Sequence, residues 1–226
     1  MYADSMQIAK NIDIVREKIA HAAIDCGRNP SDITLIAASK NANAEQINAA
    51  IKAGVNDIGE NRVQQLLEKY DRTLPVKWHF IGRLQTNKVK YIIEKVDLIH
   101  SVDNIKLAKE IDKQARRIHK TQNILIQVNF FEEKSKGGIP TEDFYIFLDN
   151  LQNLQNIAVL GVMLMAPRNV VTQLLHNCNN FVIDICKHKC NNNSYMEIVS
   201  FGMSGDFERA IACGSTAVRI GQDIFG

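Results

Sequence analysis

Short apolar stretches alternate with longer amphipathic stretches along the whole chain. Eight stretches are apolar or β-branched and short enough to form strands: residues 33–39, 57–60, 78–82, 98–102, 124–129, 157–166, 196–202 and 217–225. The seven stretches between them place apolar residues three or four positions apart, as on one face of a helix. This alternation predicts parallel strands with right-handed crossovers, and eight such units favour a closed (β/α)8 barrel of the TIM type over an open sheet.

An additional helix is expected before the first strand. Almost no chain follows the last predicted strand, because the sequence stops at Gly226, so the eighth outer helix has to come from elsewhere. Residues 6–26 can supply it, since their apolar residues share one face: Ile8, Ile12, Val15, Ile19 and Ala22. Gly27 and Pro30 then end this helix. No repeat, low-complexity tract or linker interrupts the pattern, so a single domain over residues 1–226 is expected.

Composition narrows the range of partners. A chain of 226 residues suits one barrel, and a net charge of +2 is too small to indicate a nucleic acid or an acidic surface as the main partner. Charged residues interrupt the N-terminal stretch, and no apolar run approaches the length of a membrane span. We therefore expect a soluble, cytoplasmic protein. The helices show no obvious exposed apolar face, which favours a monomer.

The cysteines give no disulfide framework, because five of them are scattered along the chain. One segment, "HNCNNFVIDICKHKC", does gather possible zinc ligands: His176, Cys178, Cys186, His188 and Cys190. It contains no Cys-x-x-Cys pair, and helical spacing near an exposed loop explains Cys186 and Cys190 equally well. Reduced thiols and no metal site are therefore expected.

The first predicted strand, in "DITLIAASK", ends on a lysine at position 40. Either the Lys40 side chain reaches solvent, or burial lowers its pKa and makes the amine a nucleophile. In a parallel barrel, function gathers at the C-terminal ends of the strands. The polar or exposed-looking residues at those ends are therefore the candidates: Lys40, Asn61, Arg83, Asn129, Met165 and Ser204.

The ends of the last two strands carry a possible anion site. "SFGMSGDFERAIACG" places two glycines, Ser204 and Asp206 before a helix, and "VRIGQDIFG" adds Gly221. Exposed amides at a helix start, with glycines that allow close approach, suit a phosphate, and these strand ends are its usual position in such barrels. Alternatively, Ser204 or Asp206 caps the helix and the glycines turn the chain. The two motifs together favour phosphate.

Barrel closure would bring Lys40 beside the eighth strand and Arg219. A lysine near a phosphate site suits a ligand that has both a carbonyl and a phosphate group, since the amine can form a Schiff base with the carbonyl group. Pyridoxal phosphate and the phosphosugar substrate of a class I aldolase both match this description.

The motifs at these positions resemble the pyridoxal phosphate homeostasis protein family, which is similar in fold to the barrel domain of alanine racemase. The resemblance runs from the first strand to the C-terminus. It rests on the ordered segments "LIAASK", "GVNDIGENRVQQ", "KWHFIGRLQTNK", "LIHSVD", "ILIQVNFFEEKSKGGI", "LGVMLMAP", "FGMSGDFERAIACGST" and "VRIGQDIFG".

The resemblance implies a barrel of the fold-type-III kind with pyridoxal phosphate held on Lys40 through a Schiff base. It also implies that Arg219 faces the pyridine nitrogen, and that the phosphate is surrounded by Ser200, Ser204 and Gly221 with nearby amides. Asn61, His79 and Met165 would line the pocket. Lys134 and Lys136, on the loop after the fifth strand, could hold a second, transient pyridoxal phosphate, although a charged loop is more often simply solvated.

An arginine at the ring nitrogen disfavours protonation there and weakens the ring as an electron sink. The related racemases add a second domain and a tyrosine acid/base contributed across a dimer, and this chain ends after the eighth strand. The resemblance therefore implies a protein that binds, buffers and hands over pyridoxal phosphate to apo-enzymes, with effects on amino-acid and keto-acid balance and no catalytic residues of its own. A pyridoxal phosphate-dependent racemase is the runner-up, and a class I aldolase the third interpretation.

Overall fold

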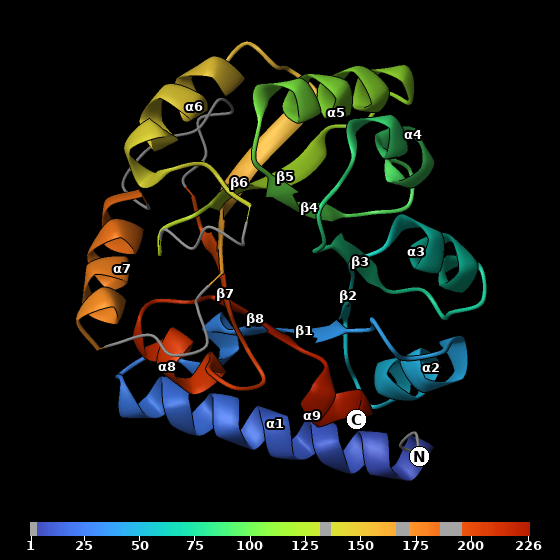
Figure 1. Ribbon diagram of the computed structural model, residues 1–226. Coiled ribbons are helices and arrows are strands. Elements are labelled where there is room, and N and C mark those ends of the chain that lie inside the picture. Colours follow the sequence, from blue (N-terminus) through green and yellow to red (C-terminus); the bar gives the residue numbers. More distant parts are fainter. Residues whose placement is uncertain (1–3, 132–136, 166–171, 186–195) are drawn as a thin grey trace.

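Eight parallel strands close into a barrel in the computed structural model, which describes residues 4–131, 137–165, 172–185 and 196–226 (Figure 1). Each strand pairs with the next in sequence, and β8 pairs with β1. The strands are β1 (Thr34–Ala38), β2 (Asp57–Glu60), β3 (Lys77–Phe80), β4 (Leu98–Val102), β5 (Gln122–Val128), β6 (Ile157–Leu164), β7 (Ile198–Met203) and β8 (Ala217–Ile220). The predicted (β/α)8 barrel is confirmed.

Helices cover the outside of the barrel (Figure 1). They are α1 (Ser5–Asp25), α2 (Ala44–Lys52), α3 (Val63–Tyr70), α4 (Val89–Ile92), α5 (Ile105–Arg117), α6 (Phe144–Leu151), α7 (Thr172–Ile185), α8 (Phe207–Ala212) and α9 (Gln222–Phe225). Asparagine side chains start two of them: Asn43 accepts from Gln46 N before α2, and Asn104 accepts from Leu107 N before α5. The helical stretch after β3 is divided, because a 3-10 helix (Thr86–Lys88) precedes α4.

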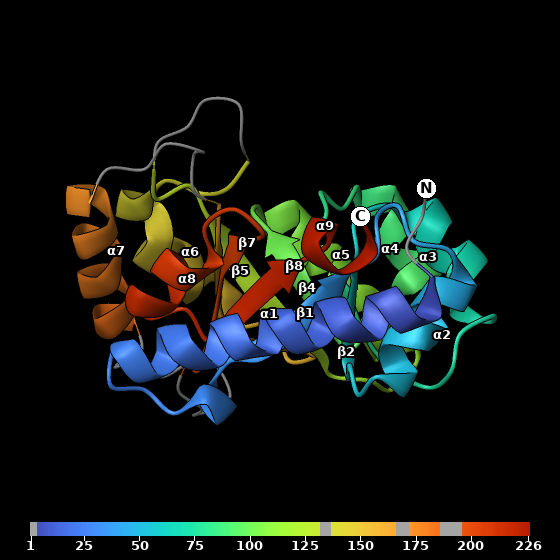
Figure 2. The same cartoon turned by 90° about the horizontal axis from the view of Figure 1, so that it is seen from below.

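The N-terminal helix α1 takes the outer place predicted for it. It packs against α2, α8 and α9 along one side of the barrel (Figure 2). Its buried face consists of Ile8, Ile12, Val15, Ile19 and Ala23. The Arg16 guanidinium also ties α1 to the chain after α2, donating to the carbonyl oxygens of Ala53 (2.9 Å) and Gly54 (2.7 Å).

The prediction of one strand over residues 217–225 is wrong in its second half. β8 ends at Ile220, and Gly221 starts the short helix α9, whose Phe225 N–H donates to the Gly221 carbonyl oxygen (2.9 Å). The apolar residues read as strand, Ile224 and Phe225, are buried. If β8 had continued as a strand, these residues would have extended past the barrel. In the helix α9 they pack against α1 instead.

Closure of the barrel sets which strand ends meet. Arg219 in β8 lies opposite Ile36 in β1, and Ile220 lies opposite Ala37. Gly221 then passes so close to the end of β1 that a Cβ there would lie 2.8 Å from the Ala38 carbonyl oxygen. Only glycine permits this approach. The ends of β1 and β8 are thereby brought together, as the sequence predicted.

Gly161 in β6 provides a test of the packing between strands. Its φ of +153° is unusual for other residues, and a Cβ there would lie 1.8 Å from the Ile198 carbonyl oxygen of β7. We expect Gly161→Ala to lower the free energy of unfolding by about 2–4 kcal/mol through backbone strain and overpacking. Gly205→Ala is the control, because a Cβ at Gly205 meets nothing within 4 Å. Urea unfolding of both variants measures the difference, and equal losses would contradict it.

Candidate functional site

Lys40 lies at the C-terminal mouth of the barrel, two residues past the end of β1. Ser39 is fully buried and still donates its N–H to the Gly59 carbonyl oxygen of β2 (2.8 Å), so the chain leaves the barrel wall only at Lys40. A turn closed by Ala42 N and the Ser39 carbonyl oxygen (3.0 Å) then directs Lys40 outward. Lys40 is exposed. Of the two alternatives, the structure has the side chain that reaches solvent.

A buried ion pair fixes the backbone that carries Lys40. The fully buried Glu60 ends β2, and its Oε2 lies 2.6 Å from Lys69 Nζ of α3. Lys69 Nζ also donates to the Ser39 carbonyl oxygen (2.7 Å), and the Ser39 hydroxyl donates to Glu60 Oε2 (3.1 Å). The other carboxylate oxygen of Glu60 accepts the N–H groups of Asn61 (2.7 Å) and Arg62 (3.2 Å). We call Ser39, Glu60 and Lys69 the Glu60 clamp, because together they hold the ends of β1 and β2.

Arg219 places a buried cation inside the barrel. Its Nη1 donates to the carbonyl oxygen (2.8 Å) and hydroxyl (2.6 Å) of Ser200 in β7, and its Nη2 donates to the Leu164 carbonyl oxygen at the end of β6 (3.2 Å). Burial lowers the pKa of Arg219 to about 10, against an opposite effect of Asp206, so the guanidinium is charged at neutral pH. Arginine has five N–H donors. These three hydrogen bonds leave two donors without an acceptor among the described residues.

A row of hydrogen bonds continues from Arg219 across the barrel interior. The Ser200 hydroxyl lies 3.0 Å from Nδ1 of the fully buried His100 in β4. His100 Nε2 lies 2.9 Å from His79 Nδ1 in β3, and His79 Nε2 lies 3.0 Å from Asp57 Oδ1 at the start of β2. We call Asp57, His79, His100 and Ser200 the polar row. It joins four strands and ends on Arg219.

The polar row changes the interpretation of two predicted pocket residues. Ser200, expected at the phosphate, has its hydroxyl in contact with Arg219 and His100. His79, expected in the pocket wall, has both ring nitrogens in contact with His100 and Asp57. Direct cofactor contacts of these two residues stay predictions, and the structure gives their polar atoms other partners.

The remaining predicted residues lie at the same mouth of the barrel. Ser204 and Asp206 lie between β7 and α8, where Asp206 Oδ1 accepts the Met203 N–H (2.6 Å), and Gly221 follows β8. Met165 follows β6 and packs against a small cluster of Leu98, Leu125 and Met163. The loop after β7 and the end of β8 therefore lie on adjacent strands, as the phosphate prediction requires.

Asn61 carries an unmatched acceptor at the mouth. It follows Glu60 directly, and its buried side-chain oxygen has no hydrogen-bond partner among the described residues. Asn61 also borders a cavity of about 830 Å³ that reaches toward the ends of β3 and β4, where Arg62, Arg83 and Lys88 contribute to the lining. A buried polar atom without a partner is costly. The Asn61 oxygen, like the spare donors of Arg219, is suited to a polar ligand.

Sequence reasoning missed four residues that the structure makes central: Asp57, Glu60, Lys69 and His100. Each had a signal, since a polar side chain stood inside a predicted strand or on the apolar face of a predicted helix. Their pairing across different strands could not be read from one chain. Among the earlier candidates, Lys134, Lys136, Cys186, His188 and Cys190 lie outside the described residues. Cys178 is buried, and burial raises its pKa to about 12.

Comparisons with known proteins show the family of this chain. The family described as the alanine racemase N-terminal domain matches residues 4–226. A pyridoxal phosphate homeostasis protein of Aquifex aeolicus is 38% identical over 98% of both chains. The chain belongs to the pyridoxal phosphate homeostasis protein family. Another relative in this family, from Escherichia coli K12, is 36% identical over 97% of this chain and 96% of its own.

Solved structures place the fold in the same family. The protein PipY of Synechococcus elongatus PCC7942, solved with pyridoxal phosphate bound, is 30% identical with a TM-score of 0.84, covering 97% of this chain and all of its own. Alanine racemase of Clostridium difficile 630 is 14% identical with a TM-score of 0.74, covering 97% of this chain and 56% of its own. The second likeness concerns the barrel alone. In the described part of this homeostasis-family chain, no helix is long and apolar enough to span a membrane.

The Glu60 clamp predicts a large effect of removing its cation. Lys69→Met leaves the Glu60 carboxylate buried without its partner, so we expect the free energy of unfolding to fall by about 3–5 kcal/mol. Lys113→Met is the control, since Lys113 pairs with Glu110 at 3.3 Å while 49% of its side chain is exposed, and about 0.5 kcal/mol or less is expected. Urea unfolding compares the two. Similar small losses would mean that the clamp contributes no more than a surface pair.

The burial of His100 leads us to expect that the free energy of unfolding depends on pH. Burial, followed by the charges of His79 and Arg219, holds the pKa of His100 well below 6.5. Below pH 6.5 the unfolded chain therefore binds a proton at His100 that the folded protein does not bind, so the free energy of unfolding falls as the pH falls, by up to about 1.4 kcal/mol per pH unit. In His100→Gln this contribution is absent. The exposed His21 provides the control, since His21→Gln should keep the wild-type slope between pH 7 and 5.

Proposed function

We propose that this protein binds pyridoxal 5′-phosphate at the C-terminal mouth of its barrel and buffers it for delivery to apo-enzymes. The observation that carries the proposal is the placement of Arg219 in β8 and of Lys40 and Gly221 just past the ends of the paired strands β1 and β8. Family membership supports it, since the relatives are named for pyridoxal phosphate homeostasis and PipY was solved with that compound.

The described residues fit the chemistry of this cofactor. When bound, pyridoxal phosphate supplies an aldehyde that a lysine amine can hold as a Schiff base, and the exposed Lys40 is the lysine proposed for that role. Arg219 offers spare donors from a buried cation, and we assign it to the pyridine nitrogen. Ser204, Gly221 and the amides around them are assigned to the phosphate, and Asn61 and Met165 to the wall.

Two features favour storage of the cofactor over turnover. A charged arginine at the pyridine nitrogen disfavours its protonation, which weakens the stabilisation of a carbanion. The exposure of Lys40 leaves its amine accessible to an incoming aldehyde, and leaves the linkage accessible to an amine that would take the cofactor away. We therefore infer a carrier whose own residues bind and orient, and the described residues include no proton donor or acceptor that we assign to racemisation.

The anchoring role of Lys40 gives a direct test. Purified protein mixed with pyridoxal phosphate should develop the visible absorbance of a lysine Schiff base, and borohydride followed by peptide mass mapping should locate the label on Lys40. Lys40→Ala should lose the band. Lys52→Ala, at the end of α2, is the matched control and should keep it. A label on another lysine, or none, would overturn the assignment.

Delivery distinguishes the carrier from the racemase alternative. Loaded protein should restore activity to an apo-enzyme that requires pyridoxal phosphate, and Lys40→Ala protein carried through the same loading should not. Amino acids incubated with loaded protein in deuterated water should show no exchange at the α-carbon at enzymic rates. Rapid exchange would favour the racemase, and a loaded protein that never delivers its cofactor would contradict the carrier.

A further inference from the structure

The polar row lies in a part of the barrel where apolar side chains are the usual filling. Four polar residues from four strands are connected there, and His100 and Ser200 are fully buried. Such a row is expensive to desolvate and is tolerated only when every polar atom in it has a partner. Neither barrel formation nor the proposed Lys40 chemistry requires it. The hydrogen bond between Ser200 and Arg219 indicates a role for the polar row at the Arg219 guanidinium.

With His79 neutral, the two ends of the row determine the direction of every hydrogen bond within it. Arg219 can only donate, so the Ser200 hydroxyl accepts from it. At the other end the Asp57 carboxylate can only accept, so His79 carries its proton on Nε2. A neutral His79 then accepts at Nδ1 from His100 Nε2, which leaves His100 Nδ1 to accept the Ser200 proton.

This arrangement satisfies all four links with both imidazoles neutral. It also removes the rotational freedom of the Ser200 hydroxyl, whose proton is held by His100 and whose lone pair therefore stays directed at Arg219 Nη1. The low pKa of His100 is consistent with a neutral ring at this position. One of the three hydrogen bonds that hold the guanidinium thus depends on residues two strands or more away.

We propose that His79 and His100 are positioning residues, which act through Ser200 to hold the Arg219 guanidinium against the pyridine nitrogen of the cofactor. The proposal rests on the proposed function for its ligand. Asp57 selects the tautomer of both histidines and is the anchor of the row. None of these side chains is required to touch the cofactor for this role.

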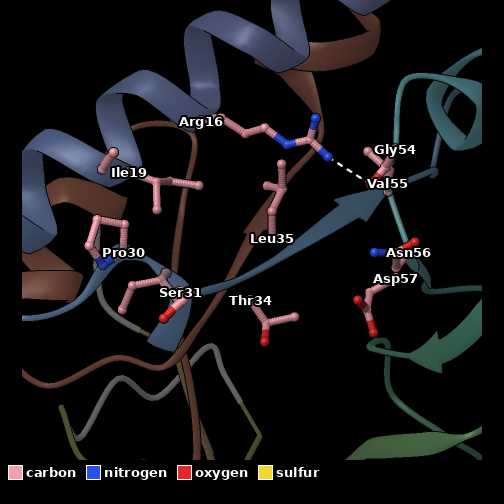
Figure 3. A pocket seen from close by; sticks show the side chains of 12 residues that line it. Arg16, Ile19, Pro30, Ser31, Thr34, Leu35, Gly54, Val55, Asn56 and Asp57 are labelled. Atoms are coloured by element: carbon pink, nitrogen blue, oxygen red, sulfur yellow. Dashed lines mark hydrogen bonds between the residues drawn. The ribbon is translucent and has the colours of Figure 1, made fainter.

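The anchor lies at the opposite end of the barrel from Lys40. Asp57 begins β2, and together with Arg16, Leu35 and Gly54 it lines a cavity of about 510 Å³ beneath α1 (Figure 3). Its side chain is 16% exposed, so Asp57 borders this cavity while its carboxylate holds His79. A change at Asp57, at the N-terminal end of the barrel, is therefore expected to alter the orientation of the Arg219 guanidinium.

The first experiment uses cofactor-free protein and nitrogen-15 NMR of histidine and arginine side chains. Wild type should show both His79 and His100 as neutral tautomers protonated on Nε2, and the Arg219 Nη signals should be resolved because rotation of the guanidinium is hindered. A Nδ1-protonated or doubly protonated ring at neutral pH would overturn the direction of the row.

Matched variants test whether the row is continuous. Ser200→Ala and Asp57→Ala should each shift the His100 nitrogens and average the Arg219 Nη signals. Ser101→Ala removes a neighbouring buried hydroxyl that has no partner among the described residues, and Asn56→Ala changes the same cavity without touching the row. Both controls should leave these signals in place. An Asp57→Ala spectrum unchanged at His100 and Arg219 would refute long-range positioning.

The second experiment adds pyridoxal phosphate labelled at the ring nitrogen. His100→Leu should move the ring nitrogen resonance and raise the dissociation constant about tenfold, the effect of one lost buried hydrogen bond. His100→Asn, which keeps an acceptor for Ser200, should recover most of both. A normal resonance and affinity in His100→Leu would overturn the proposal even if the row exists.

The two experiments separate this proposal from the proposed function. If wild type binds no pyridoxal phosphate, the proposed function fails and with it the role at the pyridine nitrogen, while the cofactor-free spectra still decide whether the row orients Arg219. If wild type binds the cofactor on Lys40 and the His100 variants behave as wild type, the proposed function stands and the positioning role is refuted.

Discussion

Closure of the barrel through β8 and β1 is the constraint on which the rest of the structure depends. It places Arg219 opposite Ile36 and brings Gly221 against Ala38, so that residues from the two ends of the sequence share one mouth. It also encloses the Arg219 guanidinium between carbonyl groups of β6 and β7, which compensate a charge that would otherwise be very costly to bury. An open sheet would leave Lys40 and Arg219 on separate edges.

The closed barrel contains two buried polar networks, the Glu60 clamp and the polar row, and each positions a different part of the mouth. The Glu60 clamp acts on the backbone, since its carboxylate and ammonium hold the Ser39 carbonyl and the Asn61 amide. The polar row acts on a side chain, since it ends on the guanidinium of Arg219. Apolar residues of similar volume would often stabilise a barrel as well or better. Polar groups retained at such a cost usually indicate a site that needs defined geometry.

The contrast between Lys40 and Arg219 explains the proposed chemistry. Arg219 is buried, charged and held by three acceptors, whereas Lys40 is exposed in a turn. An enzyme that activates a lysine usually buries it to shift its pKa. A protein that loads and releases an aldehyde gains from an amine that solvent and a receiving partner can reach. The relatives are named for pyridoxal phosphate homeostasis, which agrees with a proposed carrier more than with an enzyme.

The sequence by itself determined the barrel, the N-terminal outer helix and the strand ends at which the proposed site lies, because hydrophobic periodicity and the order of the elements are local properties of the chain. It also singled out Lys40, Arg219 and the glycine-containing ends of β7 and β8. Only the tertiary structure decided that Lys40 is exposed, that residues 222–225 form α9, and that the polar atoms of Ser200 and His79 contact Arg219, His100 and Asp57. Those outcomes depend on register and on hydrogen bonds between strands that are far apart in sequence, and a single sequence carries no record of which side chains meet across the barrel.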